Sequence, residues 1–228
     1  MGFDISPALI SIKITFIATG IIFFIGLAAA WWMTNYRGRW QGLIDGILTL
    51  PLVLPPTVAG FGILVVIGKY GPVGKFLELF GVNIIFSWYA AVIASTVVAF
   101  PLMYKTSKAA FEQIDPNILN AARTLGASEW KVFWKISVPM AWPGIAAATT
   151  LAFARSLGEF GATLMVAGSI PGKTMTIPIA IYFATAGGDM RVALIWVSII
   201  LVISLSVMVA TNYWNTYQTN IKLGAVRR

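Results

Sequence analysis

Long stretches without a charged residue dominate the sequence and alternate with short segments that carry the charges. The uncharged stretches cover residues 14–33, 46–68, 79–104, 136–154 and 192–221. A transmembrane helix needs roughly 20 predominantly apolar residues in a row. The pattern therefore predicts an all-α polytopic membrane protein in which residues 1–228 form a single transmembrane domain. We expect five spans, at about 12–33, 44–67, 87–105, 140–165 and 192–214.

Proline modifies two of the apolar segments. The second span contains Pro51, Pro55 and Pro56, so its helix is expected to be kinked or broken. Such a break is tolerated at membrane depth where neighbouring protein or a water-filled path satisfies the backbone. Residues 174–188 are apolar but too short to span, and Pro178 interrupts them. They predict a re-entrant or surface segment on the outer side.

The distribution of charge predicts the orientation in the membrane. Hydrophobic residues make up 58% of the chain and charged residues 11%, whereas soluble domains are about a quarter charged. With the N-terminus outside and the C-terminus inside, the outer segments carry Lys13, Lys69, Lys75, Lys173 and Arg191. The inner segments then carry twice as many basic residues, as the positive-inside rule requires: Arg37, Arg39, Lys105, Lys108, Arg123, Lys131, Lys135, Lys222, Arg227 and Arg228. We therefore expect a multi-pass protein of the cytoplasmic membrane. The net charge of +8 is explained by the basic residues of the inner segments and does not indicate nucleic-acid binding.

Several chemical functions are excluded by the residues that the chain lacks. It contains no cysteine and no histidine, which removes disulfides, thiolate chemistry, the commonest general base and the commonest transition-metal ligand. The segment from Gly168 to Thr174 approaches a phosphate-binding loop but has three residues before Gly-Lys-Thr, where the motif requires four. We expect no enzyme activity, metal or cofactor in this chain, so the energy for any transport must come from a partner.

The longest inner segment, about 106–139, predicts a helix-turn-helix on the cytoplasmic surface. Asp115 can cap a first helix with Pro116 at its first position, and Ile118, Leu119, Ala122 and Leu125 recur at helical spacing. Gly126 is expected to end that helix in a left-handed conformation.

A second helix is expected to follow the turn. Ser128 can cap it, Trp130, Phe133 and Trp134 share one face, and Val138-Pro139 is expected to stop it before the next span. From periodicity alone, the pair of helices is equally suited to a partner groove or to the lipid headgroups.

The spacing of this segment resembles the EAA loop of ABC importer permeases. That pattern is Glu-Ala-Ala, three residues, Gly, nine residues, then Ile-x-Leu-Pro; here Asn120 replaces the Glu and Val138 the Leu. The resemblance implies that the segment couples the spans to a separate cytoplasmic ATPase, which binds ATP-Mg. The residues implied at the coupling loop are Asn120, Ala121, Ala122, Arg123, Leu125, Gly126, Trp130, Ile136 and Pro139.

Residues 50–56, 121–127, 154–163 and 170–178 resemble the corresponding segments of molybdate importer permeases. The resemblance implies a homodimer of this subunit, two copies of the ATPase, and an extracytoplasmic oxyanion-binding protein that delivers molybdate and tungstate. Sulfate and thiosulfate permeases share much of the pattern and are the main alternative. From another class, an ion-coupled secondary transporter is the alternative, although its coupling ion would usually need several deep carboxylates.

Three charged residues inside predicted spans or at their ends need an explanation. Arg155 and Glu159 are one helical turn apart, and the predicted span places Arg155 near mid-membrane. Charges at that depth pair with each other or face a pathway, so the two residues form either a structural ion pair or part of an anion path. Asp45, at the inner start of the second span, is expected to cap that helix.

Overall fold

The chain is built from helices throughout the part that the structure describes. The computed structural model describes residues 4–226, with side chains up to residue 211 and at residue 213; the side chain of Lys222 and the residues Arg227 and Arg228 lie outside this range. The elements are α1 (Ser6–Asn35), α2 (Gln41–Val53), α3 (Pro56–Ile67), α4 (Pro72–Glu78), α5 (Trp88–Glu112), α6 (Pro116–Thr124), α7 (Glu129–Val132), the π-helical segment η1 (Phe133–Ser137), α8 (Val138–Leu157), α9 (Gly161–Ala167), α10 (Ile177–Ala186) and α11 (Met190–Val226).

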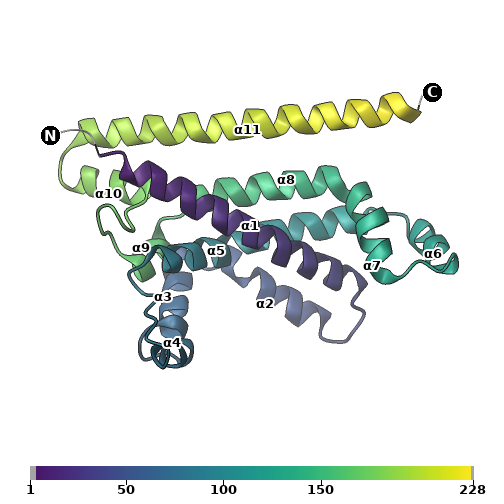
Figure 1. The fold of residues 1–228 in the computed structure, drawn as a ribbon, viewed down its shortest axis with the longest axis horizontal. Helices are drawn as coiled ribbons and strands as arrows, with labels where there is room; N and C mark the ends of the chain where they lie inside the picture. The colour runs from purple at the N-terminus through teal and green to yellow at the C-terminus, as the bar shows by residue number, and fades with distance from the viewer. Residues whose placement is uncertain (1–3, 227–228) are drawn as a thin grey trace.

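Four long helices, α1, α5, α8 and α11, run along the long axis of the molecule (Figure 1). In the described residues, four helices are long and apolar enough to cross a membrane, and α2 with α3, a pair bent by 114°, makes a fifth if the two count as one span. The expected number of spans is confirmed. The start of α1 and the end of α11 lie at opposite ends of the bundle, as an odd number of crossings requires (Figure 1). Which end faces the cytoplasm stays a prediction.

The break in the second span falls where its prolines predict. Leu54 is extended, with φ −70° and ψ 140°, and Pro55 follows with φ −53° and ψ 138°. A residue before proline is driven out of the helical region, and Pro56 then occupies the first position of α3, where its missing N–H costs nothing. Pro51, by contrast, lies within α2. The expectation of a kinked or broken helix is confirmed as a break.

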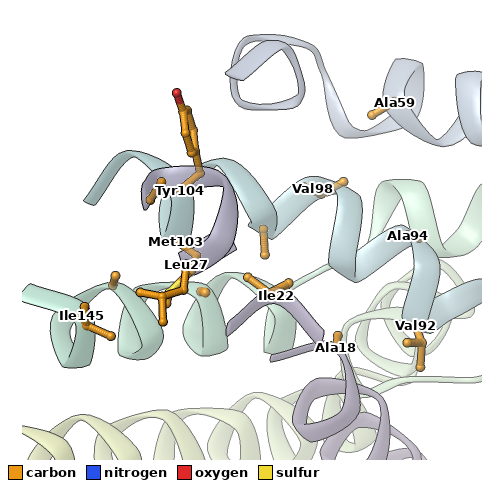
Figure 2. Close-up of a cluster of buried hydrophobic side chains, with 14 of the residues drawn as sticks. Ala18, Ile22, Leu27, Ala59, Val92, Ala94, Val98, Met103, Tyr104 and Ile145 are labelled. Carbon is orange, nitrogen blue, oxygen red and sulfur yellow. The ribbon is translucent and has the colours of Figure 1, made fainter. Parts of the chain in front are cut away.

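Small side chains allow α1, α5 and α8 to pack closely around the core. Ala18, Ala94, Ala99, Ala148 and Ala152 are fully buried. Figure 2 shows Leu27 of α1 beside Met103 of α5, while the ring of Tyr104 leaves the cluster with its hydroxyl pointing away. Since lipid is as apolar as these side chains, association depends on close van der Waals fit.

Within residues 174–188, Ile177–Ala186 form one short helix, α10. A backbone hydrogen bond from the Ile177 N–H to the Ser11 hydroxyl (2.8 Å) joins its first residue to α1. Trp196 of α11 and Ala180 of α10 belong to a small buried cluster. This segment therefore anchors the loop before α10 to the bundle end where α1 begins.

Replacing Gly26 by valine should destabilise the bundle, because a Cβ at this position would lie 2.7 Å from the Met103 Cγ. Overpacking of this kind costs about 1–3 kcal/mol. Gly20→Val on the same helix is the matched control, since nothing lies within 4 Å of its added Cβ. Thermal unfolding in detergent should show a lower midpoint for Gly26→Val than for Gly20→Val; equal midpoints would contradict the close packing of α1 on α5.

Candidate functional site

The predicted helix-turn-helix is formed by α6 and α7 at one end of the bundle (Figure 1). Asp115 caps α6 by accepting a hydrogen bond from the Asn117 N–H (2.9 Å). Gly126 ends the helix with φ +80°, and the Ala127 N–H then bonds the Ala122 carbonyl at 3.1 Å. This is the geometry of a Schellman cap, which needs a left-handed residue. The roles expected for Asp115 and Gly126 are confirmed.

Arg123 and Glu129 fasten the two helices across the turn. Arg123 donates from Nε and Nη2 to the two carboxylate oxygens of Glu129 (2.7 and 3.1 Å), and from Nη1 to Asn120 Oδ1 (3.2 Å). The pair lowers the pKa of Glu129 and raises that of Arg123, because each charge stabilises the other through these hydrogen bonds. Glu129 is not among the residues predicted for this loop from the sequence. The sequence signal that could have found it is a carboxylate placed shortly after a turn, when a basic residue stands just before that turn.

The hairpin presents an apolar surface to its surroundings. Leu125 is 88% exposed and Trp130 71% exposed, and Ile118 is exposed beside them. The opposite side is anchored, because Phe133 is buried and stacks against Trp31 of α1, with ring centroids 5.3 Å apart. A rooted hairpin with exposed large side chains is suited to docking in a groove.

The remaining predicted residues of the loop are distributed between this surface and its base. Asn120 and Ala121 are exposed on α6, Ala122 and Arg123 are half-buried, Ile136 is half-buried within η1, and Pro139 is exposed in the first turn of α8. Ser128 takes the cap position of α7 without a side-chain hydrogen bond. The expectation that its hydroxyl caps the helix is wrong.

The second helix of the hairpin does not stop at Val138-Pro139, which corrects the sequence-based expectation. It passes through the π-helical segment η1 into α8, so that Glu129–Leu157 is one helix of 29 residues. Pro139 lies within the first turn of α8, directly after η1. Such a helix is roughly 40 Å long, and it joins the hairpin directly to the opposite half of the bundle.

Arg155 and Glu159 lie at the far end of this helix. Helix α8 ends at Leu157 and α9 begins at Gly161, so the expected unbroken span to residue 165, with Arg155 at its middle, is corrected. The break falls at Gly158 and is held by Glu159. The Arg155 guanidinium lies 2.7 Å from Glu159 Oε2, and Glu159 Oε1 accepts a hydrogen bond from the Ala162 N–H at 2.9 Å. Glu159 thus binds the end of α8 and the start of α9 together.

The break in the fourth span faces the break in the second. A Cβ on Gly60 of α3 would lie 2.7 Å from the Ala162 Cα, and one on Gly161 would lie 3.2 Å from the Pro56 Cβ. The two backbones therefore meet at glycine. A cavity of about 230 Å³ opens at this junction and is lined by Pro56, Thr57, Arg155, Gly158, Glu159, Phe160 and Gly161. A guanidinium beside two interrupted helices is an arrangement that can contact an anion.

Asp45 does not cap α2, which is a further correction. It lies inside the helix and accepts hydrogen bonds from Tyr104 Oη (2.6 Å), Lys105 Nζ (2.7 Å) and Lys108 Nζ (3.0 Å) of α5. Since no residue of α2 is buried in the described chain, this cluster is its main polar attachment to the bundle. It fixes the second span near the end of α5 that leads into the hairpin.

The sequence profile of the family described as binding-protein-dependent transport system inner membrane component matches residues 22–215. The chain is 47% identical over 200 residues to the putative molybdenum transport system permease protein YvgM of Bacillus subtilis (strain 168), covering 87% of this chain and 88% of that one. It is 42% identical over 205 residues to the molybdenum transport system permease protein ModB of Escherichia coli (strain K12), with coverages of 89% and 90%. The probable sulfate transport system permease protein cysT of Chlorokybus atmophyticus is 32% identical over 209 residues, with coverages of 92% and 73%.

Solved structures share the fold at lower sequence identity. A chain of the MetNI methionine ABC transporter in an inward-facing conformation superposes with a TM-score of 0.75 at 17% identity, covering 92% of this chain and 94% of that one. A chain of a bacterial alginate ABC transporter in complex with a pentasaccharide-bound periplasmic protein gives a TM-score of 0.69 at 17% identity, with coverages of 93% and 82%. The fold of the described chain is therefore shared with chains of ABC transporters of known structure.

A double-mutant cycle should reveal the coupling between Arg155 and Glu159. Glu159→Gln keeps an acceptor for the Ala162 N–H but leaves Arg155 without its counter-charge, whereas Arg155→Gln leaves a buried carboxylate, so each single variant should be less stable than the parent. Breaking a fully buried ion pair lowers stability by up to about 3–5 kcal/mol. Because Arg155 is partly exposed, we expect a smaller coupling energy between the two residues, of about 1–3 kcal/mol. Thermal unfolding of the four proteins measures it; strictly additive effects would contradict the pairing.

Proposed function

Because the chain belongs to the family of binding-protein-dependent transport system inner membrane components, we propose that it is the permease subunit of an ABC importer for molybdate in the cytoplasmic membrane. The two molybdenum transport relatives are clearly more similar to it than the sulfate relative. Tungstate, which has nearly the same size and charge, is expected to be carried as well. Sulfate and thiosulfate are the alternative substrates within the same class.

The proposed complex contains partners that supply energy and substrate. Two copies of this permease would bind two copies of a cytoplasmic ATPase, which holds ATP-Mg, and an extracytoplasmic protein would deliver the oxyanion. In this proposal the permease would supply the path across the membrane, and the partner ATPase would carry out ATP hydrolysis. The α6–α7 hairpin would lie on the cytoplasmic side, in keeping with the excess of basic residues at that end.

One observation carries the coupling mechanism: the hairpin and the Arg155 junction are the two ends of one helix, Glu129–Leu157. Exposed Leu125 and Trp130 would dock in a groove of the ATPase. When the ATPase closes around ATP and moves the hairpin, the anchored helix transmits this displacement to the residues that line the cavity. The end of α8 would then shift against the broken second span and open or close the path.

The junction suits a doubly charged oxyanion better than a coupling cation. Arg155 is the one basic side chain that lines this cavity in the described chain, and its guanidinium can donate two parallel hydrogen bonds to oxygens. Glu159, the carboxylate that an ion-coupled secondary transporter would use, is already engaged by Arg155 and by the Ala162 N–H. This arrangement favours the ATP-driven class over the secondary transporter.

ATP-driven uptake in proteoliposomes tests the proposal directly. The permease with its co-purifying ATPase is reconstituted, and binding protein loaded with molybdate, tungstate or sulfate is added outside. We expect uptake of molybdate and tungstate that requires ATP, and much less uptake of sulfate. Uptake of sulfate alone would identify sulfate, rather than molybdate, as the substrate. Uptake driven by an ion gradient without ATP would overturn the ABC assignment.

Replacing Gly126 by valine should uncouple ATP hydrolysis from transport. Its φ of +80° is strained for a residue with a Cβ although nothing lies within 4 Å of the added atom, and a left-handed conformation costs about 1–2 kcal/mol for such a residue. Gly126→Asn is the matched control, because asparagine tolerates this conformation. Uptake per ATP hydrolysed should fall about tenfold or more for valine and stay near the parent value for asparagine; an unchanged ratio in the valine variant would contradict the coupling role.

A further inference from the structure

A second cavity, of about 310 Å³, lies at the end of the bundle opposite the hairpin. Its walls come from the start of α1, from the start of α5 with the two residues before it, and from the loop before α10. Its lining comprises Ile10, Lys13, Ile14, Phe86, Ser87, Trp88, Gly172 and Lys173. No part of the coupling loop or of the Arg155 junction contributes to it.

Two lysines from distant parts of the chain converge on this cavity. Lys13 comes from α1 and Lys173 from the loop before α10, and no carboxylate belongs to the lining in the described residues. The Lys13 ammonium lies 3.7 Å from the centre of the Trp88 ring, and neither lysine forms an ion pair within the described chain. At the two sites above, by contrast, Arg123 and Arg155 are paired with carboxylates. Two uncompensated ammonium groups attract an anion.

The backbone segments that carry the two lysines are fixed by hydrogen bonds, while both lysine side chains are exposed. Lys173 follows Gly172, whose φ is +72°, in a turn where three consecutive N–H groups, from Lys173 to Met175, bond the Ile170 carbonyl. The Ile177 N–H, four residues later, bonds the buried Ser11 hydroxyl on α1. This hydrogen bond joins the loop to the helix that carries Lys13, so the two segments that contribute the lysines are packed together.

The third wall of the cavity is also rigid. Phe86 adopts φ +59°, which is unusual for a bulky residue, and its N–H bonds the Val166 carbonyl at 3.0 Å. Ser87 then caps α5, and its hydroxyl accepts from the Ala90 N–H. The start of α5 adds the partial positive charge of a helix N-terminus to that of the lysines.

We propose that Lys13 and Lys173 hold an oxyanion in this cavity, distinct from the anion path at Arg155. Ammonium groups donate hydrogen bonds and accept none, which selects for phosphate-like or molybdate-like groups against cations and neutral ligands. Such a group has two possible sources at a membrane end: a free tetrahedral oxyanion, or the phosphate of a phospholipid headgroup. Lysine and tryptophan are typical of the membrane interface, and both sources share the same chemistry at the site.

Two binding experiments on the full-length chain distinguish the sources. In the first, the permease in nanodiscs of uncharged glycolipid is titrated with molybdate and with inorganic phosphate by isothermal calorimetry. In the second, the permease purified from phosphatidylglycerol-containing micelles is analysed by native mass spectrometry for retained phospholipid. The test variant is Lys13→Gln/Lys173→Gln. The control, Lys69→Gln/Lys75→Gln, removes the same charge from segments expected on the same side.

We expect the test variant to lose about tenfold or more in the affinity for the free oxyanion or in the fraction of retained phospholipid, since charge-assisted hydrogen bonds are the strong ones. The control variant and Lys13→Arg/Lys173→Arg should bind as the parent does. A loss in the calorimetric titration assigns the site to a free oxyanion, and a loss in lipid retention assigns it to a phospholipid. Binding of neither ligand by the parent, or equal binding by the test and control variants, would overturn the proposal.

Discussion

The need to satisfy every backbone polar group inside the membrane is the constraint on which the rest of this structure depends. Hydrocarbon offers no hydrogen bonds, so a span can be interrupted only where protein or water receives the freed groups. The chain meets this requirement by placing its two interruptions against each other. The break at Leu54-Pro55 faces the break at residues 158–160, and Gly60 and Gly161 let the two backbones come into contact. Irregular backbone, which would be costly in lipid, is thereby concentrated at one junction beside the cavity that Arg155 lines.

The same constraint explains why one helix can connect two distant functions. Because a helix satisfies its own backbone groups, Glu129–Leu157 continues from the hairpin through the bundle without a break. Its π-helical segment lies where the hairpin meets the bundle, and π-helical turns occur frequently at functional sites. Phe133 in that segment packs against Trp31 and Phe111, so the start of the helix is anchored to α1 and α5. The hairpin is therefore joined to the bundle by a helix rather than by a loop.

The features that the sequence predicts correctly are those encoded by single residue types with strong local preferences. Apolar length places the spans, proline places the break in the second span, and Asp115 and Gly126 place the ends of α6. The features it misses depend on contacts between distant segments. Instead of capping its own helix, Asp45 accepts hydrogen bonds from Tyr104 and from two lysines of α5. Glu129 forms an ion pair with Arg123 across a turn. Pro139 was expected to stop a helix, but the helix Glu129–Leu157 continues through it, directly after the π-helical segment η1.

The pairing of Arg155 also bears on how an anion could pass the junction. A lone arginine in a cavity with few other polar groups would bind a doubly charged oxyanion tightly, and a path must release its substrate as readily as it admits it. Glu159 neutralises most of this attraction while it holds α8 to α9. An oxyanion would therefore meet a compensated guanidinium whose attraction increases only if movement of α8 separates the pair. Lys13 and Lys173 carry no such compensation in the described chain, which suits a place where an oxyanion stays rather than one that it passes.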